Sequence, residues 1–267
     1  FGELTSNRNE MLFWMILISV LGWIVCSMGL QNGVEKMTKF MMSSLFVIML
    51  ILVVRATTLD GAIDGLKFYL LPDFGKMAEN GFKEAVFAAM GQSFFTLSVG
   101  IGALAIFGSY IGKERRLTGE AISITVLDTV VALVAGLIIF PSCFAFDVNP
   151  GQGPGLVFVT LPNVFREMAG GRIWGALFFL FMSFAAFSTI IAVFQNIIQF
   201  ARDMWGISLK KSVLINGVLL ILLAVPCVLG MTDWAGFSIG GKSIMDIEDF
   251  LVSNNLLPIG SLVYLLF

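Results

Sequence analysis

Seven stretches of this 267-residue chain are apolar for long enough to cross a lipid bilayer as helices. The hydrocarbon core of a bilayer is about 30 Å thick, and a helix needs about 20 residues to cross it. The stretches are residues 11–30, 37–55, 85–112, 119–146, 173–201, 212–230 and a last one that starts near residue 243. None of them alternates apolar and polar residues as the strands of a membrane barrel do. We therefore expect an all-α polytopic membrane protein that lies in a lipid bilayer.

The composition supports this class and excludes others. Hydrophobic residues make up 58% of the chain and charged residues 13%, whereas about 25% of the residues in a soluble domain are charged. The 16 lysines and arginines are matched by 18 aspartates and glutamates, so no basic excess is available to attract nucleic acid. The sequence has no histidine, the commonest general base and transition-metal ligand. These counts argue against a soluble enzyme and against a nucleic-acid partner.

The loop charges indicate which side of the membrane each loop occupies. Eight cations lie in the short loops after the first, third and fifth apolar stretches: Lys36, Lys39, Lys113, Arg115, Arg116, Arg202, Lys210 and Lys211. Short loops rich in lysine and arginine stay in the cytoplasm. We therefore expect a plasma (inner) membrane protein with residue 1 on the extracellular side. Because no signal peptide precedes the first stretch, we also expect an odd number of further spans before residue 1.

Two connections on the extracellular side are long. Residues 56–83 and 147–172 exceed ordinary loop lengths, and such loops are often lids or gates. The second contains a glycine-rich turn at 151–155, an apolar segment at 156–165 and the pair Gly170-Gly171. We interpret residues 147–172 as a turn, a short helix and a second turn that together form an extracellular lid folding back toward a vestibule.

The third apolar stretch is interrupted by polar residues and glycines. Residues 91–102 read GQSFFTLSVGIG, and glycine costs about 1 kcal/mol relative to alanine inside a helix. Non-helical backbone at this depth is tolerated only against protein or a water-filled cavity. One interpretation is a discontinuous helix whose free backbone groups bind a solute. The other is close helix packing through small residues.

Asp128 is a carboxylate in the interior of the fourth stretch. A charge there costs roughly 2.5–3.5 kcal/mol on insertion scales, and such residues usually face a pathway or a partner. We interpret Asp128 as a sodium ligand, with a proton relay or a hydrogen bond between helices as alternatives. Ser188 and Thr189 alone would donate back to their own helix. With Asp128, Thr96 and Ser98, they indicate an oxygen-lined cavity.

These residues resemble the neurotransmitter:sodium symporter family, especially bacterial amino-acid transporters of the leucine-transporter type. Residues 91–102, continuing to Gly-Ser-Tyr at 108–110, are similar to the family's unwound sixth span. Residues 155–165 (GLVFVTLPNVF) are similar to its fourth extracellular loop, and Gln195 and Asp203 fit its eighth span. The resemblance covers essentially the whole chain.

The resemblance implies an inverted-repeat fold with broken helices, of which this chain covers spans four to ten. Residues 11–55 would be the last two spans of the first repeat, and residues 84–267 an incomplete second repeat. Three spans would then precede residue 1, which is an odd number, as the loop charges require independently.

The resemblance also implies roles for individual residues. The substrate-contacting positions would be Phe95, Thr96, Ser98, Ile101, Thr189 and Val193, with Phe95 as an aromatic lid. Two sodium sites are implied, one with Thr96 and Asp128 and the other with the Ala185 carbonyl and the Ser188 and Thr189 hydroxyls. The gating positions would be Tyr110 and Asp203 at the inner gate, Asp249 at the outer gate, and Phe95 as the lid above the substrate.

The implied function is sodium-coupled symport of a small amino acid or related amine by alternating access. A proton-coupled carrier and a non-transporting scaffold subunit are the alternatives. Many family members have asparagine at the position of Asp128, and a fixed negative charge there would replace chloride beside the sodium ion. We therefore expect transport without chloride. The oligomeric state and the particular amino acid do not follow from the sequence.

Overall fold

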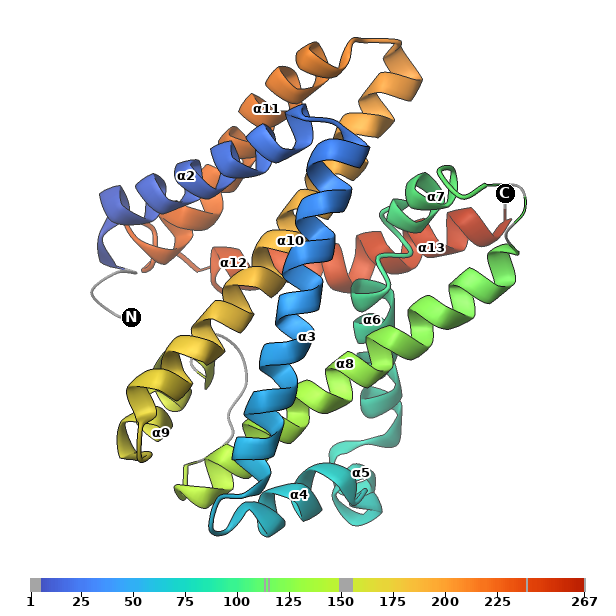
Figure 1. Cartoon of the computed structure of the whole chain (residues 1–267). Helices are drawn as coiled ribbons and strands as arrows, with labels where there is room; N and C mark the ends of the chain where they lie inside the picture. The colour runs from blue at the N-terminus through green and yellow to red at the C-terminus, as the bar shows by residue number, and fades with distance from the viewer. Residues whose placement is uncertain (1–5, 113, 115, 149–155, 239, 267) are drawn as a thin grey trace. The chain divides into compact units, whose positions relative to one another are not determined.

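The computed structural model describes residues 6–112, 114, 116–148, 156–238 and 240–266, and most of them are helical (Figure 1). In the described residues, six helical segments are long and apolar enough to cross a membrane. Their bounds are Arg8–Ser27, Gly33–Thr57, Leu117–Ala145, Gly171–Trp205, Leu209–Met231 and Ile244–Leu266. Six of the seven predicted spans are therefore confirmed, with ends that differ by a few residues. The predicted span 85–112 is not one helix.

Most of the spans correspond to single helices, and short helices connect or interrupt them. The long helices are α2 (Arg8–Ser27), α3 (Lys36–Thr57), α8 (Leu117–Ala145), α10 (Gly171–Trp205) and α11 (Leu209–Met231). The shorter ones are α4 (Ala62–Leu70), α5 (Phe74–Asn80), α6 (Phe82–Thr96), α7 (Ala103–Gly108), α9 (Leu161–Glu167), α12 (Ile244–Leu251) and α13 (Leu257–Leu266). Three π-helical turns, Leu30–Glu35, Leu156–Thr160 and Val252–Leu256, precede α3, α9 and α13.

The helices form two compact units. Unit 1 comprises Phe1–Thr38, Lys83–Leu117 and Phe187–Phe267, and unit 2 comprises Lys39–Phe82 and Thr118–Ala186. Helix α10 contributes to both, because its residues up to Ala186 belong to unit 2 and the following ones to unit 1. The predicted division into two repeats follows different boundaries and stays a prediction.

Small residues bring the long helices of unit 1 together. Helix α2 runs along α11 (Figure 1), and a Cβ on Gly217 of α11 would overlap the indole of Trp23. A Cβ on Gly22 would lie 2.8 Å from the ring of Phe194 on α10. Apolar helices in a bilayer associate through such close packing, because lipid is as apolar as their own side chains.

The core of unit 2 is apolar and includes the short helix α9. Its buried members are Leu45, Ile48, Met49, Leu52, Ile138, Cys143, Leu161, Phe165, Met168, Phe178 and Phe181. They come from α3, α8, the α9 segment and α10. Gly170 follows α9 with φ +73°, a left-handed conformation that glycine adopts without a side-chain clash. The predicted short helix and second turn of the 147–172 connection are thus confirmed, whereas residues 149–155 lie outside the described part.

The other long connection, residues 56–83, is fastened to α8 by its first helix. Tyr69 of α4 stacks on Phe140 with ring centroids 4.7 Å apart, and its hydroxyl donates to the Ala132 carbonyl at 3.4 Å. A Cβ on Gly65 would lie 2.6 Å from the Phe140 carbonyl oxygen. The backbones of α4 and α8 therefore touch, and this part of the connection is a packed element of unit 2.

Candidate functional site

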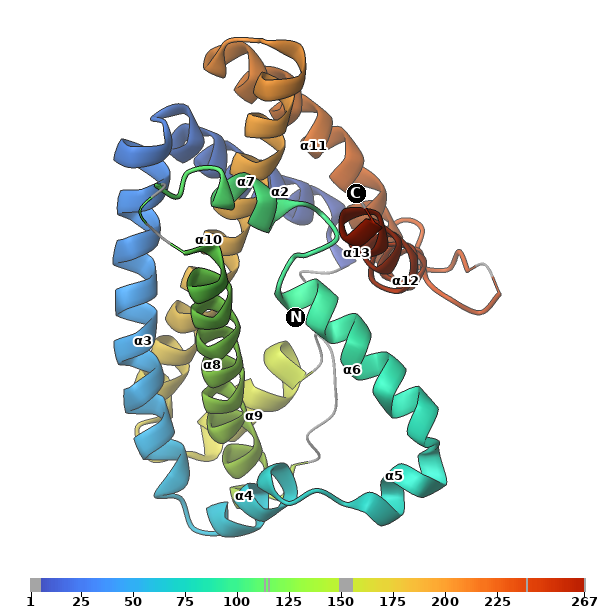
Figure 2. The ribbon, with the colours of Figure 1, turned by 90° about the vertical axis from the view of Figure 1, so that its right-hand side faces the viewer.

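The third apolar stretch contains a true break in its helix. Helix α6 ends at Thr96 and α7 begins at Ala103, with turns between them (Figure 2). Ser98 has φ +51° and Gly102 has φ +73°. A non-glycine residue in the left-handed region costs roughly 1–3 kcal/mol and is common at functional sites. The discontinuous helix predicted from the sequence is therefore confirmed.

The break leaves backbone groups available for a ligand. Its internal hydrogen bonds run from the Ser98 amide to the Phe95 carbonyl (3.1 Å), from Val99 to Phe94 (3.3 Å) and from Gly102 to Val99 (3.2 Å). The amides of Gly100 and Ile101 have no backbone hydrogen bond to any residue that the structure describes. Free amides and carbonyls inside a membrane protein require partners, and a bound solute or ion can supply them.

Backbone packing also contributes to the break. A Cβ on Gly100 would lie 2.7 Å from the Leu257 Cα of α13, and a Cβ on Gly260 would overlap the Gly100 carbonyl oxygen. The unwound segment and α13 thus meet backbone to backbone, which only glycine permits. The glycine-rich stretch is therefore both a broken helix and a site of close packing, and solute binding by its free backbone groups stays a prediction.

A buried side chain from α10 holds the end of the break. The Asn196 Nδ2 donates to the Ile101 carbonyl at 3.2 Å, and the Asn196 side chain is only 7% exposed. The sequence reasoning did not select Asn196. Its spacing from Thr189 and Val193 is the signal that could have identified it, since these residues follow one face of a helix.

The predicted substrate positions all fall in unit 1, on two elements. Phe95, Thr96, Ser98 and Ile101 lie at or in the break, and Phe95 and Ile101 are 56% and 43% exposed. The other two, Thr189 and Val193, lie on α10 and are spaced by four residues, so they share a helix face.

The predicted sodium ligands are divided between the units. Asp128 and Ala185 belong to unit 2, whereas Thr96, Ser188 and Thr189 belong to unit 1. Asp128 is half-buried in the interior of α8, and Ser188 is buried. The described residues contain no group of three or more His, Cys, Asp or Glu side chains that could hold a metal ion. The predicted ligands are instead hydroxyls, a carbonyl and one carboxylate, the oxygen donors that hard cations take.

The predicted gating residues are exposed and have separate partners. Asp203 accepts a hydrogen bond from the Gln199 Nε2 at 2.8 Å, and the Gln199 Oε1 accepts one from Arg202 at 3.0 Å. Asp249 accepts one from the Ser253 hydroxyl at 2.7 Å. In the described part of unit 1, Tyr110 makes no hydrogen bond with Asp203. The predicted inner-gate pair, Tyr110 and Asp203, is therefore not hydrogen-bonded in the described residues.

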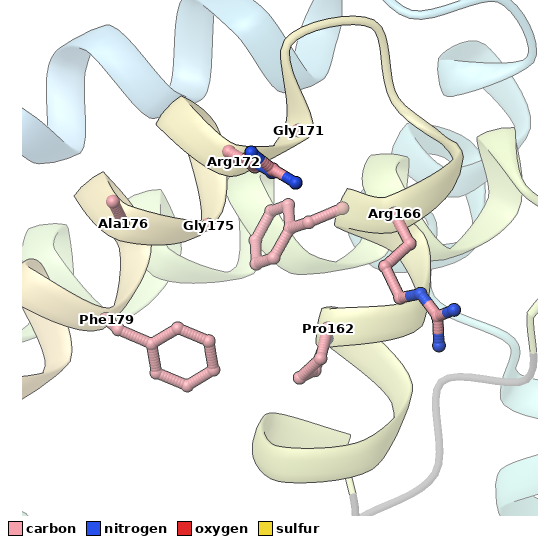
Figure 3. Close-up of a pocket in the computed structure, with 8 residues that line it drawn as sticks. Pro162, Arg166, Gly171, Arg172, Gly175, Ala176 and Phe179 are labelled. Atoms are coloured by element: carbon pink, nitrogen blue, oxygen red, sulfur yellow. The ribbon is translucent and has the colours of Figure 1, made fainter.

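An open pocket of about 460 Å³ lies between α9 and the first turns of α10 in unit 2 (Figure 3). Phe165 and Phe179 provide apolar surface, and Arg166 and Arg172 provide positive charge. Both arginines are exposed. The sequence reasoning did not select this pocket, because α9 and α10 each contribute only one arginine and one aromatic ring to it.

Comparison with known proteins decides the family. Residues 5–249 match the profile of the sodium:neurotransmitter symporter family. The chain belongs to this family. This match confirms the family predicted from residues 91–102 and 155–165. Members of the family are transporters and not enzymes.

Individual relatives support the assignment. This symporter-family chain is 34% identical over 267 residues to the uncharacterized sodium-dependent transporter YhdH of Bacillus subtilis (strain 168). The match covers 100% of the chain and 58% of YhdH. The sodium-dependent nutrient amino acid transporter 1 of Drosophila grimshawi is 28% identical over 245 residues, which cover 84% of the chain and 38% of that protein.

The fold is also found in a solved structure. The crystal structure of MhsT in complex with L-phenylalanine matches with a TM-score of 0.87 and 35% identity. The match covers 98% of the chain and 59% of MhsT. The leucine-transporter-type fold predicted from the resemblance is therefore confirmed. The chain spans somewhat more than half the length of YhdH and MhsT.

Proposed function

We propose that the protein is a sodium-coupled symporter of amino acids, with its solute site at the break between α6 and α7. The observation that carries this proposal is the unwound backbone around Ser98, with free amides at Gly100 and Ile101 in the described residues. Membership of a sodium symporter family supports the choice of ion. As the chain spans 58% of its relative YhdH, transport is assigned to the full-length product of the gene.

In the proposed mechanism, sodium ions stabilise the state that binds the solute. An ion can shift a conformational equilibrium only by binding one state more tightly than the other. The reciprocal effect is that bound solute raises the affinity for sodium. Each sodium ion that enters the cell down a potential of 100 mV supplies about 2.3 kcal/mol. This energy drives accumulation of the solute by alternating access.

The proposed ion sites are the two sets implied by the resemblance. Thr96 and Asp128 hold one sodium ion beside the solute, and the Ala185 carbonyl with Ser188 and Thr189 holds the second. The side chain of Asp128 supplies the fixed negative charge at the first site. Transport is therefore proposed to proceed without chloride.

The proposed solute pocket combines polar backbone with apolar side chains. Free backbone groups of the break meet the solute's charged ends, and Phe95, Ile101 and Val193 surround its side chain. The exposed faces of Phe95 and Ile101 make them available for this contact. L-Phenylalanine is the first probe, because the related MhsT structure contains it. Tyr110, Asp203 and Asp249 are the proposed gating residues.

The test is an uptake screen in cells that express the full-length gene. Radiolabelled amino acids, beginning with L-phenylalanine, are offered in sodium medium and in potassium medium. Uptake that requires sodium and persists in chloride-free gluconate medium is expected. Uptake driven equally well by a proton gradient in potassium medium would instead indicate a proton-coupled carrier. No uptake of any amino acid by a correctly inserted protein would indicate a scaffold.

A further inference from the structure

Asn196 contacts the backbone of the break directly. Its Nδ2 lies 3.2 Å from the Ile101 carbonyl oxygen. The orientation of the amide is defined by chemistry, because an amide oxygen in that place would set two acceptors against each other. Because the contact is with the main chain, it constrains the backbone conformation and does not depend on which side chain residue 101 carries.

The bonded carbonyl lies where the break ends. Ile101 precedes Gly102, whose φ of +73° turns the chain into α7. The Gly102 amide bonds back to Val99 at 3.2 Å. The Asn196 bond therefore holds the last peptide of the unwound segment at a point where the backbone has left the helical hydrogen-bond pattern.

Asn196 also continues the α10 face that carries two proposed solute contacts. It follows Val193 by three residues and Thr189 by seven, and both spacings keep side chains on one face of a helix. This face leads from exposed Thr189 to buried Asn196. The hydrogen bond thus joins this face of α10 to the unwound segment within unit 1.

Burial makes this bond consequential. Asn196 is 7% exposed, and its Oδ1 has no hydrogen-bond partner in the described residues. A buried amide with an unpaired oxygen is unfavourable for stability alone. The bond that offsets part of this cost is the one to the Ile101 carbonyl, which an apolar residue in place of Asn196 would leave without its side-chain partner.

We propose that Asn196 is a positioning residue, whose amide presets the unwound backbone at Ile101 for binding of the solute. The effect on transport rests on the proposed function, whereas the effect on the backbone does not. Without the amide, the segment 97–102 samples more conformations, and the competent one is populated less. Apparent affinity falls in proportion to that population.

The first measurement is hydrogen–deuterium exchange of the peptide covering residues 97–103 in the purified full-length protein. Potassium buffer is used, so that neither sodium nor solute contributes. Asn196→Leu is expected to speed exchange in this peptide by about two- to tenfold, the range that one net hydrogen bond supports. Unchanged exchange in a folded Asn196→Leu protein would overturn the proposal.

Asn216→Leu is the matched control. Asn216 is an equally buried asparagine of unit 1, 8% exposed, but its amide bonds to the Ser212 carbonyl and hydroxyl within α11. Its loss is expected to leave exchange at 97–103 unchanged. Equal acceleration by both variants would show general loosening and would overturn the proposal. If Asn196→Leu does not fold, Asn196→Ala is measured against Asn216→Ala in the same way.

The second measurement separates binding from turnover. Uptake of radiolabelled L-phenylalanine, or of the amino acid that the screen identifies, is expected to show a KM raised several-fold with little change in maximal rate in Asn196→Leu. A lower maximal rate at unchanged KM would contradict a positioning role. Faster exchange in a protein that transports no amino acid would contradict the proposed function alone and leave the backbone role standing.

Discussion

At the scale of single residues, Ser98 and Asp128 depart most from ordinary membrane-helix chemistry. Ser98 holds a left-handed conformation, with φ +51°, that serine rarely adopts. Asp128 places a carboxylate in the interior of α8, where insertion of a charge is costly. We expect ligand binding to offset these costs, and the proposed ligands are the solute near Ser98 and a sodium ion at Asp128.

Asp128→Ala is expected to remove one sodium site. Without its carboxylate oxygen, the affinity for sodium falls and the dependence of uptake on sodium concentration becomes less steep. Sodium titration of uptake by the full-length protein measures both. Thr129→Ala is the control, since the Thr129 hydroxyl donates within α8 to the Thr125 carbonyl at 2.8 Å. An unchanged sodium affinity in Asp128→Ala would refute the assignment of this residue.

Asp128→Asn addresses the role of chloride. The substitution keeps the size of the side chain and one carbonyl oxygen but removes the negative charge. Uptake by the unaltered protein is expected to be the same in chloride and in gluconate, whereas uptake by Asp128→Asn is expected to require chloride. Chloride dependence of the unaltered protein would show that Asp128 does not supply the balancing charge.

The sequence predicted the unusual residues of the proposed site better than the residues that hold them in position. Gly100, Ser98 and Asp128 stand out because their residue types contradict an apolar helix. Asn196 does not stand out in this way. It bonds to the backbone carbonyl of Ile101, which is 95 positions away, and neither residue type reveals that bond. The assembly of the predicted sodium ligands likewise stays a prediction, as Asp128 and Thr96 lie in different units.

At the scale of elements, the bilayer fixes what the sequence can predict. The predicted spans 119–146 and 212–230 became Leu117–Ala145 and Leu209–Met231, because length and hydropathy determine a membrane helix. The helix α4 was not foreseen inside the 56–83 connection. Its contacts, such as Tyr69 on Phe140, depend on tertiary packing that the local pattern does not contain.

Gly260→Ala is expected to separate α13 from the break. The new Cβ would overlap the Gly100 carbonyl oxygen, and overpacking of this kind costs about 1–3 kcal/mol. A lower midpoint of thermal unfolding and weaker solute binding should follow in the purified full-length protein. Gly119→Ala is the control, because a Cβ there meets no described atom within 4 Å. Equal unfolding midpoints for the two variants would mean that this backbone contact is unimportant.

At the scale of the whole molecule, the two compact units each hold part of the proposed machinery. Unit 1 contains the break and the α10 wall, and unit 2 contains Asp128 and the packed connections around α4 and α9. The chain matches 59% of the MhsT chain. The proposed transport cycle is therefore tested with the full-length protein.

The most direct test is accumulation of solute in proteoliposomes that contain the full-length protein. An inward sodium gradient is imposed with no chloride, no proton gradient and no membrane potential, and the internal concentration of labelled amino acid is followed. The account predicts a transient rise above the external concentration, which collapses when a sodium ionophore is added. Equilibration without accumulation, or accumulation that persists after the sodium gradient is removed, would contradict sodium-coupled symport.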